Sequence, residues 1–155
     1  MIAVVQRVTK GRVTVAHEVV GEIAHGLVVL ASVHADDTDA DIQWTANKLV
    51  NLRIFTNGDK YFDLDLRQVQ GSLLLVSNFT VAADTRSGRR PGLSAAAAPE
   101  MGRRLFDALI AAAQQLGVPV QTGRFGADMR VDIENDGPVT FILDSRESRK
   151  TLPSA

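Results

Sequence analysis

Apolar and polar positions in the first part of the chain follow the periods of β-strands. Residues 2–8 (IAVVQRV) are rich in β-branched side chains, which favours a strand. Residues 12–16 and 19–23 are predicted to form a hairpin that turns at Ala16-His17-Glu18. Residues 26–33 (GLVVLASV) form a continuous apolar run, which is typical of a strand that is covered on both faces.

The apolar period changes to that of a helix in residues 39–51. Thr38 and Asp41 have the spacing of a capping box, in which two side chains satisfy free N–H groups at the start of a helix. The apolar positions that follow lie on one face of the helix: Ile42, Ala46, Leu49 and Val50. These features predict a helix with one buried side.

A second helix is predicted from Pro99 to Leu116. Proline suits the first helical position, and Gly117 followed by Pro119 ends the helix. Its apolar stripe consists of Met101, Leu105, Ala108 and Ala112. The segment before it, residues 83–98, contains Gly88, Pro91, Gly92 and Ser94 and is predicted to be a long loop.

The remaining apolar runs are short, which favours strands. They are residues 53–56, 71–80 (a buried strand that runs out into a loop), 118–122, 129–135 and 139–143. Asn57-Gly58 marks a turn after the first run, and Asp136-Gly137-Pro138 lies between the last two. No GxGxxG or GxxxxGK[ST] motif follows a strand. The prediction is therefore an α/β protein, with a mixed sheet and two main helices packed on it, and not a doubly wound nucleotide-binding fold.

The length and composition indicate one domain without covalent or metal cross-links. The 155 residues suit a single domain at 1–145, followed by a polar tail at 146–155 that we expect to fray. The chain contains no cysteine, which excludes disulfides, thiolate metal sites and cysteine nucleophiles. No apolar run approaches the roughly 20 residues of a membrane span, and no signal peptide is recognisable. We therefore expect a cytoplasmic protein with no metal, cofactor or membrane partner.

The charge balance argues against extensive contact with nucleic acid. The sequence has 17 basic and 18 acidic residues, so it lacks the basic surplus that duplex-binding modules carry. Aromatic residues make up 5% of the chain, too few for a long single-strand stacking platform. Binding of a single terminal nucleotide remains compatible with these numbers.

Three glycine-rich or polar loops interrupt good strands. They are Ser77-Asn78-Phe79-Thr80, residues 123–129 (GRFGADM) and residues 135–140 (NDGPVT). Glycine in such loops lets a ligand approach the backbone closely, because no Cβ intervenes. Spacing alone also fits ordinary turns, in which glycine is common.

The three segments, in this order, resemble those of the D-aminoacyl-tRNA deacylase family. That family has a Ser-Gln-Phe-Thr motif, then a Gly-Arg-Phe loop, then Asn-x-Gly-Pro-Val-Thr. Three further segments of this chain are also similar to the family: Val5-Gln6-Arg7-Val8, Ala83-Asp84-Thr85-Arg86 and Arg90-Pro91. The resemblance covers about residues 1–144, and several separate motifs in one order make a chance match improbable.

The resemblance implies a strongly curved sheet and an editing hydrolase. Members cleave the ester that joins a D-amino acid, or glycine mischarged on tRNA-Ala, to the 3′ end of tRNA. They are homodimers with sites at the subunit interface, where a cis Gly-Pro bond reaches into the partner's pocket. That bond corresponds here to Gly137-Pro138. Arg7 would orient the Gly-Pro carbonyls, although a strand-edge surface charge is an equally good interpretation.

The catalytic step that the resemblance implies uses few protein side chains. Main-chain N–H groups near Phe79 and Thr80 would stabilise the oxyanion, and the 2′-hydroxyl of the terminal ribose would assist hydrolysis. A Thr80 nucleophile would need an adjacent base, whereas the histidines (His17, His25, His34) lie outside the motifs. The other interpretation of the Thr80 hydroxyl is a local hydrogen bond to the backbone.

Substrate-binding positions follow from the same motifs. They are Arg7, Ser77, Asn78, Phe125, Gly126, Ala127, Met129, Asn135, Gly137 and Pro138. Phe125 and Met129 also fit a role in the core. Arg86, Arg89 and Arg90 form the densest basic loop and are predicted to contact phosphates of the tRNA end, unless this loop is simply solvated.

Two positions depart from the family pattern. Asn78 stands where glutamine is usual, and Phe62-Asp63 replaces a Met-Asn pair. The shorter amide at Asn78 and the carboxylate at Asp63 change what these side chains can bond. Two alternatives to D-aminoacyl-tRNA hydrolysis stay open, of which only the first follows from these departures. One is a dimer that binds a tRNA end or a peptide without turnover, and the other is a hydrolase of free D-amino acid esters or peptides with Thr80 as nucleophile.

Overall fold

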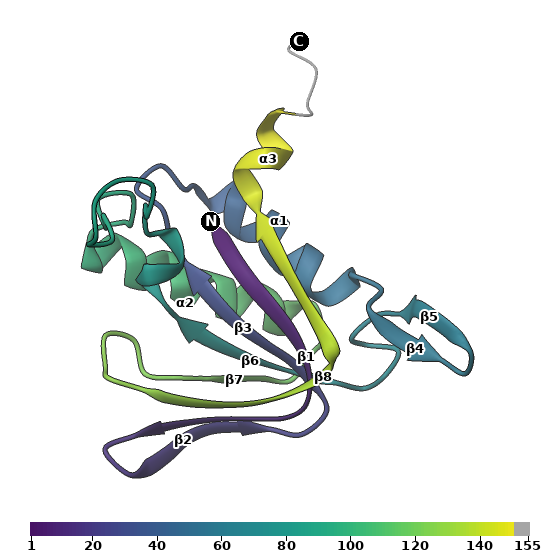
Figure 1. The fold of residues 1–155 in the computed structure, drawn as a ribbon. Coiled ribbons are helices and arrows are strands. Elements are labelled where there is room, and N and C mark those ends of the chain that lie inside the picture. The colour runs from purple at the N-terminus through teal and green to yellow at the C-terminus, as the bar shows by residue number, and fades with distance from the viewer. Residues whose placement is uncertain (151–155) are drawn as a thin grey trace.

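A six-stranded mixed sheet forms the centre of the fold (Figure 1). The structure, a computed structural model, describes residues 1–150. The sheet consists of β1 (Ile2–Val15), β2 (Glu18–Ile23), β3 (Gly26–Ser32), β6 (Ser72–Ser77), β7 (Val120–Thr122) and β8 (Arg130–Asp144). The order is β2-β1-β3-β6-β7, and β8 also pairs with β1. The β3–β6 and β6–β7 pairs are parallel and the others antiparallel, as the prediction of a mixed sheet requires.

Two long strands curve the sheet until it is nearly closed. The first half of β1 pairs with β3 and the second half with β2, while β8 runs antiparallel to β1 along most of its length. The prediction of separate strands at 2–8 and 12–16 is wrong, because β1 continues through Thr9 and Lys10. These two side chains are both exposed, next to a shift in the β1–β8 register. The alternation of buried and exposed residues along β1 is therefore interrupted here, although β1 stays paired with β8.

The prediction of separate strands at 129–135 and 139–143 is also wrong, because both belong to β8. The register against β1 shifts between Gln6 and Val8, whose partners on β8 are Thr140 and Asn135. The residues between these partners therefore bulge out of the ladder opposite Arg7. A bulge of this kind bends the strand locally without ending it.

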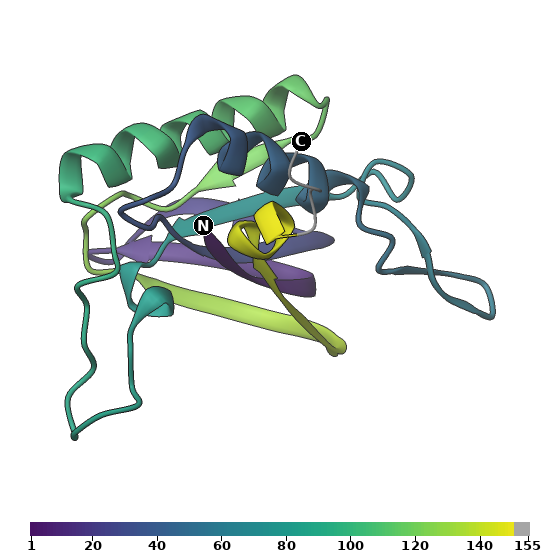
Figure 2. The same cartoon turned by 90° about the horizontal axis from the view of Figure 1, so that it is seen from above.

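Two helices cover one face of the sheet, α1 (Asp39–Asn51) and α2 (Pro99–Gln115), and they lie side by side (Figure 2). The bounds of α1 are those predicted, and the Thr38–Asp41 capping box is present. The apolar faces of both helices pack into one core with the inner side chains of β1, β3 and β6. Because the helices occupy one face only, the opposite face of the β1–β8 pair is left without a helix over it.

A small hairpin, β4 (Phe55–Asn57) and β5 (Lys60–Leu64), projects from the sheet after α1. The strand predicted at 53–56 starts two residues later, at Phe55, and the residues of β5 were not predicted as a strand. Lys60, Tyr61 and Phe62 are exposed, so β5 has no alternation of buried and exposed positions to reveal it.

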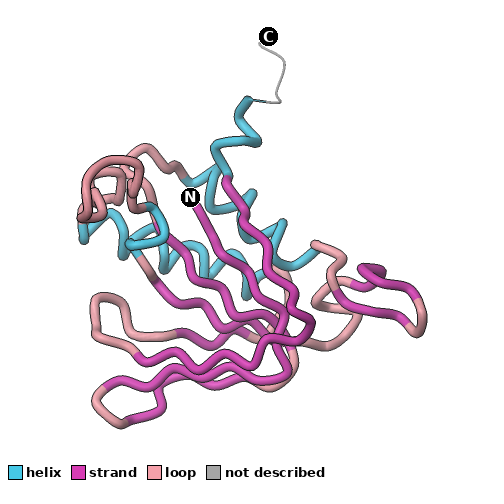
Figure 3. Tube along the Cα trace, in the orientation of Figure 1, coloured by secondary structure: helices cyan, strands magenta, loops and turns pink. Residues whose placement is uncertain are grey.

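The strand predicted at 71–80 ends at Ser77, and a 3₁₀ helix, η1 (Phe79–Ala82), follows Asn78. The long loop predicted at 83–98 is present. Figure 3 shows that this loop and the loop between β7 and β8 lie on the same side of the molecule. The polar tail predicted at 146–155 begins within a short helix, α3 (Ser145–Lys150), and residues 151–155 lie outside the described residues. None of the described helices is long and apolar enough to cross a membrane.

Candidate functional site

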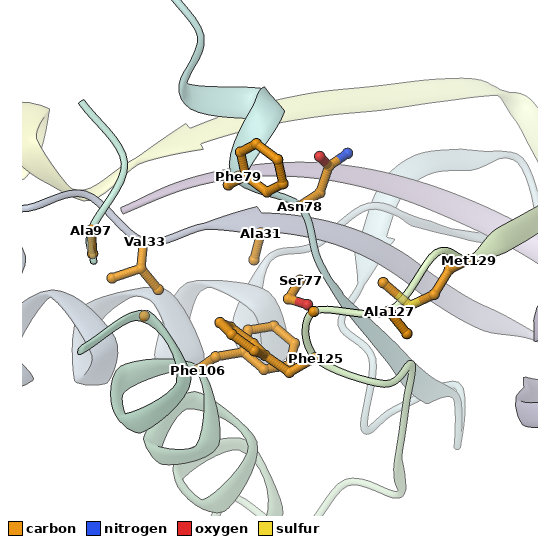
Figure 4. A pocket seen from close by; sticks show the side chains of 12 residues that line it. Ala31, Val33, Ser77, Asn78, Phe79, Ala97, Phe106, Phe125, Ala127 and Met129 are labelled. Carbon is orange, nitrogen blue, oxygen red and sulfur yellow. The ribbon is translucent and has the colours of Figure 1, made fainter. Parts of the chain in front are cut away.

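A mostly apolar pocket lies where the ends of β3 and β6 meet the start of α2 and the loop before β8 (Figure 4). Seven of the residues predicted from sequence line it: Ser77, Asn78, Phe79, Phe125, Gly126, Ala127 and Met129. The structure thus brings together the first two of the three loop motifs. The other lining residues were not singled out from sequence: Ala31, Val33, Ala97, Gly102 and Phe106.

Parallel pairing of β3 with β6 explains why these segments meet. Ala31 pairs with Ser77, and the N–H of Asn78 donates to the carbonyl of Ala31 at 2.8 Å. β7 runs parallel to β6, and Gly123, just after β7, donates to Leu75 at 3.1 Å. The chain therefore leaves β3, β6 and β7 at the same end of the sheet, where parallel α/β sheets commonly bind ligands.

Asn78 fixes the conformation of the first motif. Its Oδ1 accepts the main-chain N–H of Thr80 at 3.1 Å and the Thr80 hydroxyl at 2.5 Å. The carbonyl of Phe79 accepts the hydroxyl of buried Ser32 at 3.4 Å. The Phe79 ring is 60% exposed at the mouth of the pocket. The asparagine thus acts as the N-cap of η1, a role that its short amide performs well.

These contacts bear on the chemistry of Thr80. Its hydroxyl proton bonds an amide oxygen, which is not a base, and none of the three histidines lines the pocket. His17 is in the β1–β2 turn, His25 packs edge-on against Phe55 with ring centroids 5.1 Å apart, and His34 is buried near Arg146. An activated hydroxyl nucleophile needs an adjacent base, so the geometry favours a local hydrogen-bonding role of Thr80, although its partner is the Asn78 side chain and not the backbone.

The second motif forms the facing wall of the pocket. The Phe125 ring tilts against Phe106 with centroids 6.2 Å apart. A Cβ at Gly123 would lie 2.6 Å from the sulfur of Met129, so glycine lets the loop pack this closely without displacing that side chain. Phe125 and Met129 are half-buried and pack against the core as well as lining the pocket. The core role that the sequence allowed for these two residues is therefore present, together with a place on the pocket wall.

The third motif lies at the opposite end of the sheet from the pocket. The Gly137-Pro138 bond is cis, as the resemblance implied, and both residues are exposed. Arg7 lies opposite this turn and pairs with Leu27 on β3. Ala31, at the pocket, is four residues further along β3, which is about 13 Å at the rise of a strand. Within one chain, therefore, the Gly-Pro turn does not line the pocket.

Hydrogen bonds hold the Gly-Pro turn from both sides. Asn135 Nδ2 donates to the carbonyls of Arg7 at 3.2 Å and Val139 at 2.9 Å, and its Oδ1 accepts the N–H of Val139 at 3.1 Å. Gly137 has φ +155°, and a Cβ there would lie 2.4 Å from the nitrogen of Val139. Only glycine fits this turn without displacing the backbone.

The predicted arginine contacts lie on the exposed loop after η1. Asp84 and Gly92 bond each other across the base of this loop. Arg86 makes a two-point ion pair with Asp84, at 2.9 and 2.7 Å, which lowers the pKa of Asp84 and raises the pKa of Arg86. Among the described residues, Arg89 and Arg90 make no ion pair. The loop thus presents two arginines without a carboxylate partner and one that is already neutralised.

The second departure from the family pattern lies on the β4–β5 hairpin. Asp63 accepts hydrogen bonds from Arg53 and from Asn57, the latter at 2.9 Å. These partners, Asn57 first and then Arg53, lower the pKa of Asp63. Phe62 packs edge-to-face on Phe141 of β8, with centroids 5.8 Å apart. The carboxylate therefore has local partners, and neither residue lines the pocket. No group of metal-ligating side chains occurs among residues 1–150.

Comparison with known proteins places the fold and the motifs in one family. The family model described as D-Tyr-tRNA(Tyr) deacylase matches residues 4–144. A D-aminoacyl-tRNA deacylase of Pseudomonas fluorescens (strain Pf-5) is 50% identical over 145 residues, covering 94% of this chain and 100% of that protein. One of Pelobacter propionicus is 51% identical over 144 residues, covering 93% and 99%. The chain belongs to the D-Tyr-tRNA(Tyr) deacylase family.

A solved structure shows the same architecture. The protein described as c-Myc DNA Unwinding Element Binding Protein superposes with a TM-score of 0.89 at 33% identity, covering 93% of this chain and 98% of that one. The strongly curved mixed sheet with two main helices packed on it is therefore the fold of this family, as predicted from the resemblance.

Proposed function

We propose that this protein hydrolyses the ester bond of D-aminoacyl-tRNA in the cytoplasm, releasing the free D-amino acid and tRNA. The observation that carries the proposal is the pocket built from residues 77–79, 125–127 and 129, in segments on which the family resemblance rests. The relatives described above are named D-aminoacyl-tRNA deacylases. Family membership over nearly the whole chain supports transfer of that activity.

The pocket is suited to a terminal nucleoside. Its walls are mostly apolar, with Phe79 and Phe125 offering aromatic surface and Asn78 and Ser77 a few polar groups. Apolar walls with a small number of placed polar groups are usual for ligand pockets, and aromatic side chains stack on bases. The 3′-terminal adenosine of tRNA would occupy this pocket, with its ester beside the N-terminal end of η1.

Catalysis would rely on the main chain and on the substrate. The N–H of Thr80 is occupied by Asn78 Oδ1, whereas no hydrogen bond joins the N–H of Phe79 to another described residue. The Phe79 N–H is therefore the better donor to an oxyanion, a role that amides at the end of a strand perform well. The 2′-hydroxyl of the terminal ribose would supply the assistance that no side chain of the pocket offers.

Selection of the D form would come from main-chain atoms of a second copy of the chain. Gly137-Pro138 is exposed and lies away from the pocket of its own chain. In a homodimer with the site at the interface, its carbonyls would form a wall in the partner's pocket. An L side chain would collide with such a wall, whereas a D side chain points away and glycine has none, so glycine mischarged on tRNA-Ala would also be cleaved.

The uncovered face of the β1–β8 pair supports a homodimer. Ile142 on β8 is 72% exposed, and its partner Val4 and the neighbouring Ile2 on β1 are only half-buried. This apolar stripe is continuous with the strand that carries Gly137-Pro138, and neither α1 nor α2 lies over it. A second copy that covered the stripe would remove apolar area from water and bring the Gly-Pro turn to the interface.

The direct test is multiple turnover on D-tyrosyl-tRNA, measured as loss of the aminoacyl ester against the uncatalysed rate. The proposal predicts many turnovers per subunit, and loss of most of the rate when the terminal adenosine lacks its 2′-hydroxyl. Binding of the tRNA without cleavage would instead support the non-catalytic alternative. Undiminished cleavage without the 2′-hydroxyl would contradict the assisting role of the ribose.

A further inference from the structure

Arg103 lies near the start of α2, at the rim of the pocket. Its guanidinium carbon sits 4.7 Å from the centroid of the Phe125 ring, and Nη2 donates to the carbonyl of Phe125 at 3.4 Å. The preceding residue, Gly102, lines the pocket itself. An exposed side chain is thus held in one place, over the outer side of the pocket's aromatic wall.

The charge of Arg103 is not neutralised by the protein. Nearby arginines have carboxylate partners: Arg104 pairs with Asp39 at 3.3 Å and Arg124 with Glu18 at 3.7 Å. Arg103 has no such partner among residues 1–150. The guanidinium carbon lies over the Phe125 ring, and only one of the five N–H donors is used on the Phe125 carbonyl.

We propose that Arg103 binds the phosphate on the 5′ side of the terminal nucleotide of the substrate. The inference rests on the proposed function, which seats the terminal adenosine in the pocket. The strand that leads to a seated nucleotide must cross the rim, and its first charged group is that phosphate. A positioned guanidinium with free paired donors matches a phosphate in charge and in geometry. The two contacts with Phe125, to its ring and to its carbonyl, hold the guanidinium at the rim before the substrate arrives.

A structural role for Arg103 is the competing interpretation, because its contacts with Phe125 also hold the loop before β8. The two roles differ in what they require of the substrate. A phosphate contact matters only when the phosphate is present. A displaced Phe125 wall would instead impair every substrate that uses the pocket, including one without any phosphate.

The first experiment measures binding of a short single-stranded RNA that ends in CCA, by fluorescence anisotropy at several salt concentrations. Loss of one phosphate contact should make the salt slope of log K shallower by about 0.7 in Arg103→Gln. The affinity at low salt should fall about tenfold, since one lost charge-assisted contact to phosphate is worth about 1.4 kcal/mol. Arg104→Gln removes the same charge from the next position of the helix and should change the slope and the affinity little. Equal binding by wild type and Arg103→Gln would overturn the inference.

The second experiment compares D-tyrosyl-tRNA with D-tyrosyl-adenosine, which lacks the phosphate. In Arg103→Gln the ratio of kcat/KM on the tRNA to kcat/KM on the adenosine ester should fall about tenfold, through KM and not kcat. Arg103→Lys keeps the charge without the planar fork, so its ratio of kcat/KM values should lie between those of the wild type and Arg103→Gln. Equal losses on both substrates would assign Arg103 to the loop and overturn the phosphate contact.

The two proposals fail in different ways. RNA binding requires no turnover. If the wild-type protein binds the RNA through Arg103 but leaves the ester intact, the proposed hydrolase activity is wrong and the phosphate contact of Arg103 stands. If the wild-type protein cleaves the ester and Arg103→Gln binds RNA equally well, the phosphate contact of Arg103 is wrong and the proposed hydrolase activity stands.

Discussion

Arg7 on β1 holds the main chain of Asp136, the residue that precedes the Gly-Pro turn on β8. Arg7 Nε lies 3.1 Å from the Asp136 carbonyl and 3.0 Å from its carboxylate oxygen, and Nη1 donates to the carbonyl of Ile54 at 2.8 Å. The arginine is 7% exposed. Of the two interpretations that the sequence left open, a surface charge or a support for the turn, these contacts match the second.

Replacing Arg7 with lysine should loosen the turn. A lysine ammonium cannot span the carbonyls of Asp136 and Ile54 as the planar fork does. We expect Arg7→Lys to lower the free energy of unfolding by about 1–3 kcal/mol, because a buried acceptor loses its donor. We also expect a smaller ratio of D- to L-tyrosyl-tRNA hydrolysis.

Urea unfolding measures the stability of Arg7→Lys, and the hydrolysis rates of D- and L-tyrosyl-tRNA measure its selectivity. Arg12→Lys, on the same strand with an exposed Asp132 partner, is the matched control and should change neither quantity.

Asn78 should matter more than Thr80. Asn78→Ala removes the cap of η1, which costs about 1 kcal/mol for a helix cap, and releases the amides next to the ester. Activity should fall by about tenfold, as expected for that loss of positioning. Thr80→Ala keeps the cap on its main chain and should retain most of the activity, whereas loss of a nucleophile costs on the order of 10⁴-fold or more. The measurement is the rate of D-tyrosyl-tRNA hydrolysis by the two variants. An inactive Thr80→Ala variant would support Thr80 as the nucleophile.

His34 should make the protein less stable in mild acid. Burial first, and then the charges of Arg146 and the N-terminal ammonium, lower the pKa of His34, while Asp37 and Asp36 act in the opposite direction. Its Nε2 has no hydrogen-bond partner among the described residues. The unfolded chain therefore takes up a proton at this group before the folded chain does. The stability it contributes is complete above the unfolded pKa of about 6.5 and declines as pH falls below it.

His34→Gln should remove part of that decline. The measurement is the free energy of unfolding in urea between pH 7.5 and pH 5, where the variant should lose less stability than the wild type. His17→Asn removes an exposed histidine from the β1–β2 turn and should leave the pH dependence as it is. If the free energy of unfolding changes with pH in the same way for the wild type and His34→Gln, the buried imidazole contributes nothing to the pH dependence of stability.

Ile142→Asp should dissociate the proposed homodimer. A carboxylate on the apolar stripe would be buried without a partner when a second copy covers it, which is costly. Val19→Asp, which changes another exposed apolar residue on β2, should leave the dimer intact. Sedimentation gives the oligomeric state, and D-tyrosyl-tRNA hydrolysis gives the activity. A monomeric wild type, or a monomeric Ile142→Asp with full activity and D selectivity, contradicts the interface.

The two helices and the motif order could be predicted from sequence because their signals are local. Thr38, Asp41 and the apolar face of α1 lie within a few turns of one another, and Pro99 marks the start of α2 by its own geometry. The continuity of β1 and β8 could not be predicted, since exposed Thr9 and Lys10 and the Gly-Pro bulge interrupt the patterns that strands usually show.

The missed pocket residues share a different cause. Gly102 and Phe106 occupy the buried face of α2, where small and aromatic side chains ordinarily form core. Only the long-range packing of α2 against the loop that carries Phe125 turns them into a pocket wall. Sequence periodicity reports which side of a helix is buried and does not report what it is buried against.

The most direct test of the central claim, selection of the D form by main-chain atoms, is the D-to-L ratio of kcat/KM for tRNAs charged with alanine, tyrosine and tryptophan. A wall of backbone carbonyls rejects every L side chain and contacts no D side chain. We expect a preference of about 100-fold or more, near 3 kcal/mol, for each of the three D esters. A ratio near one for any pair, or a preference that tracks the size of the D side chain, would contradict it.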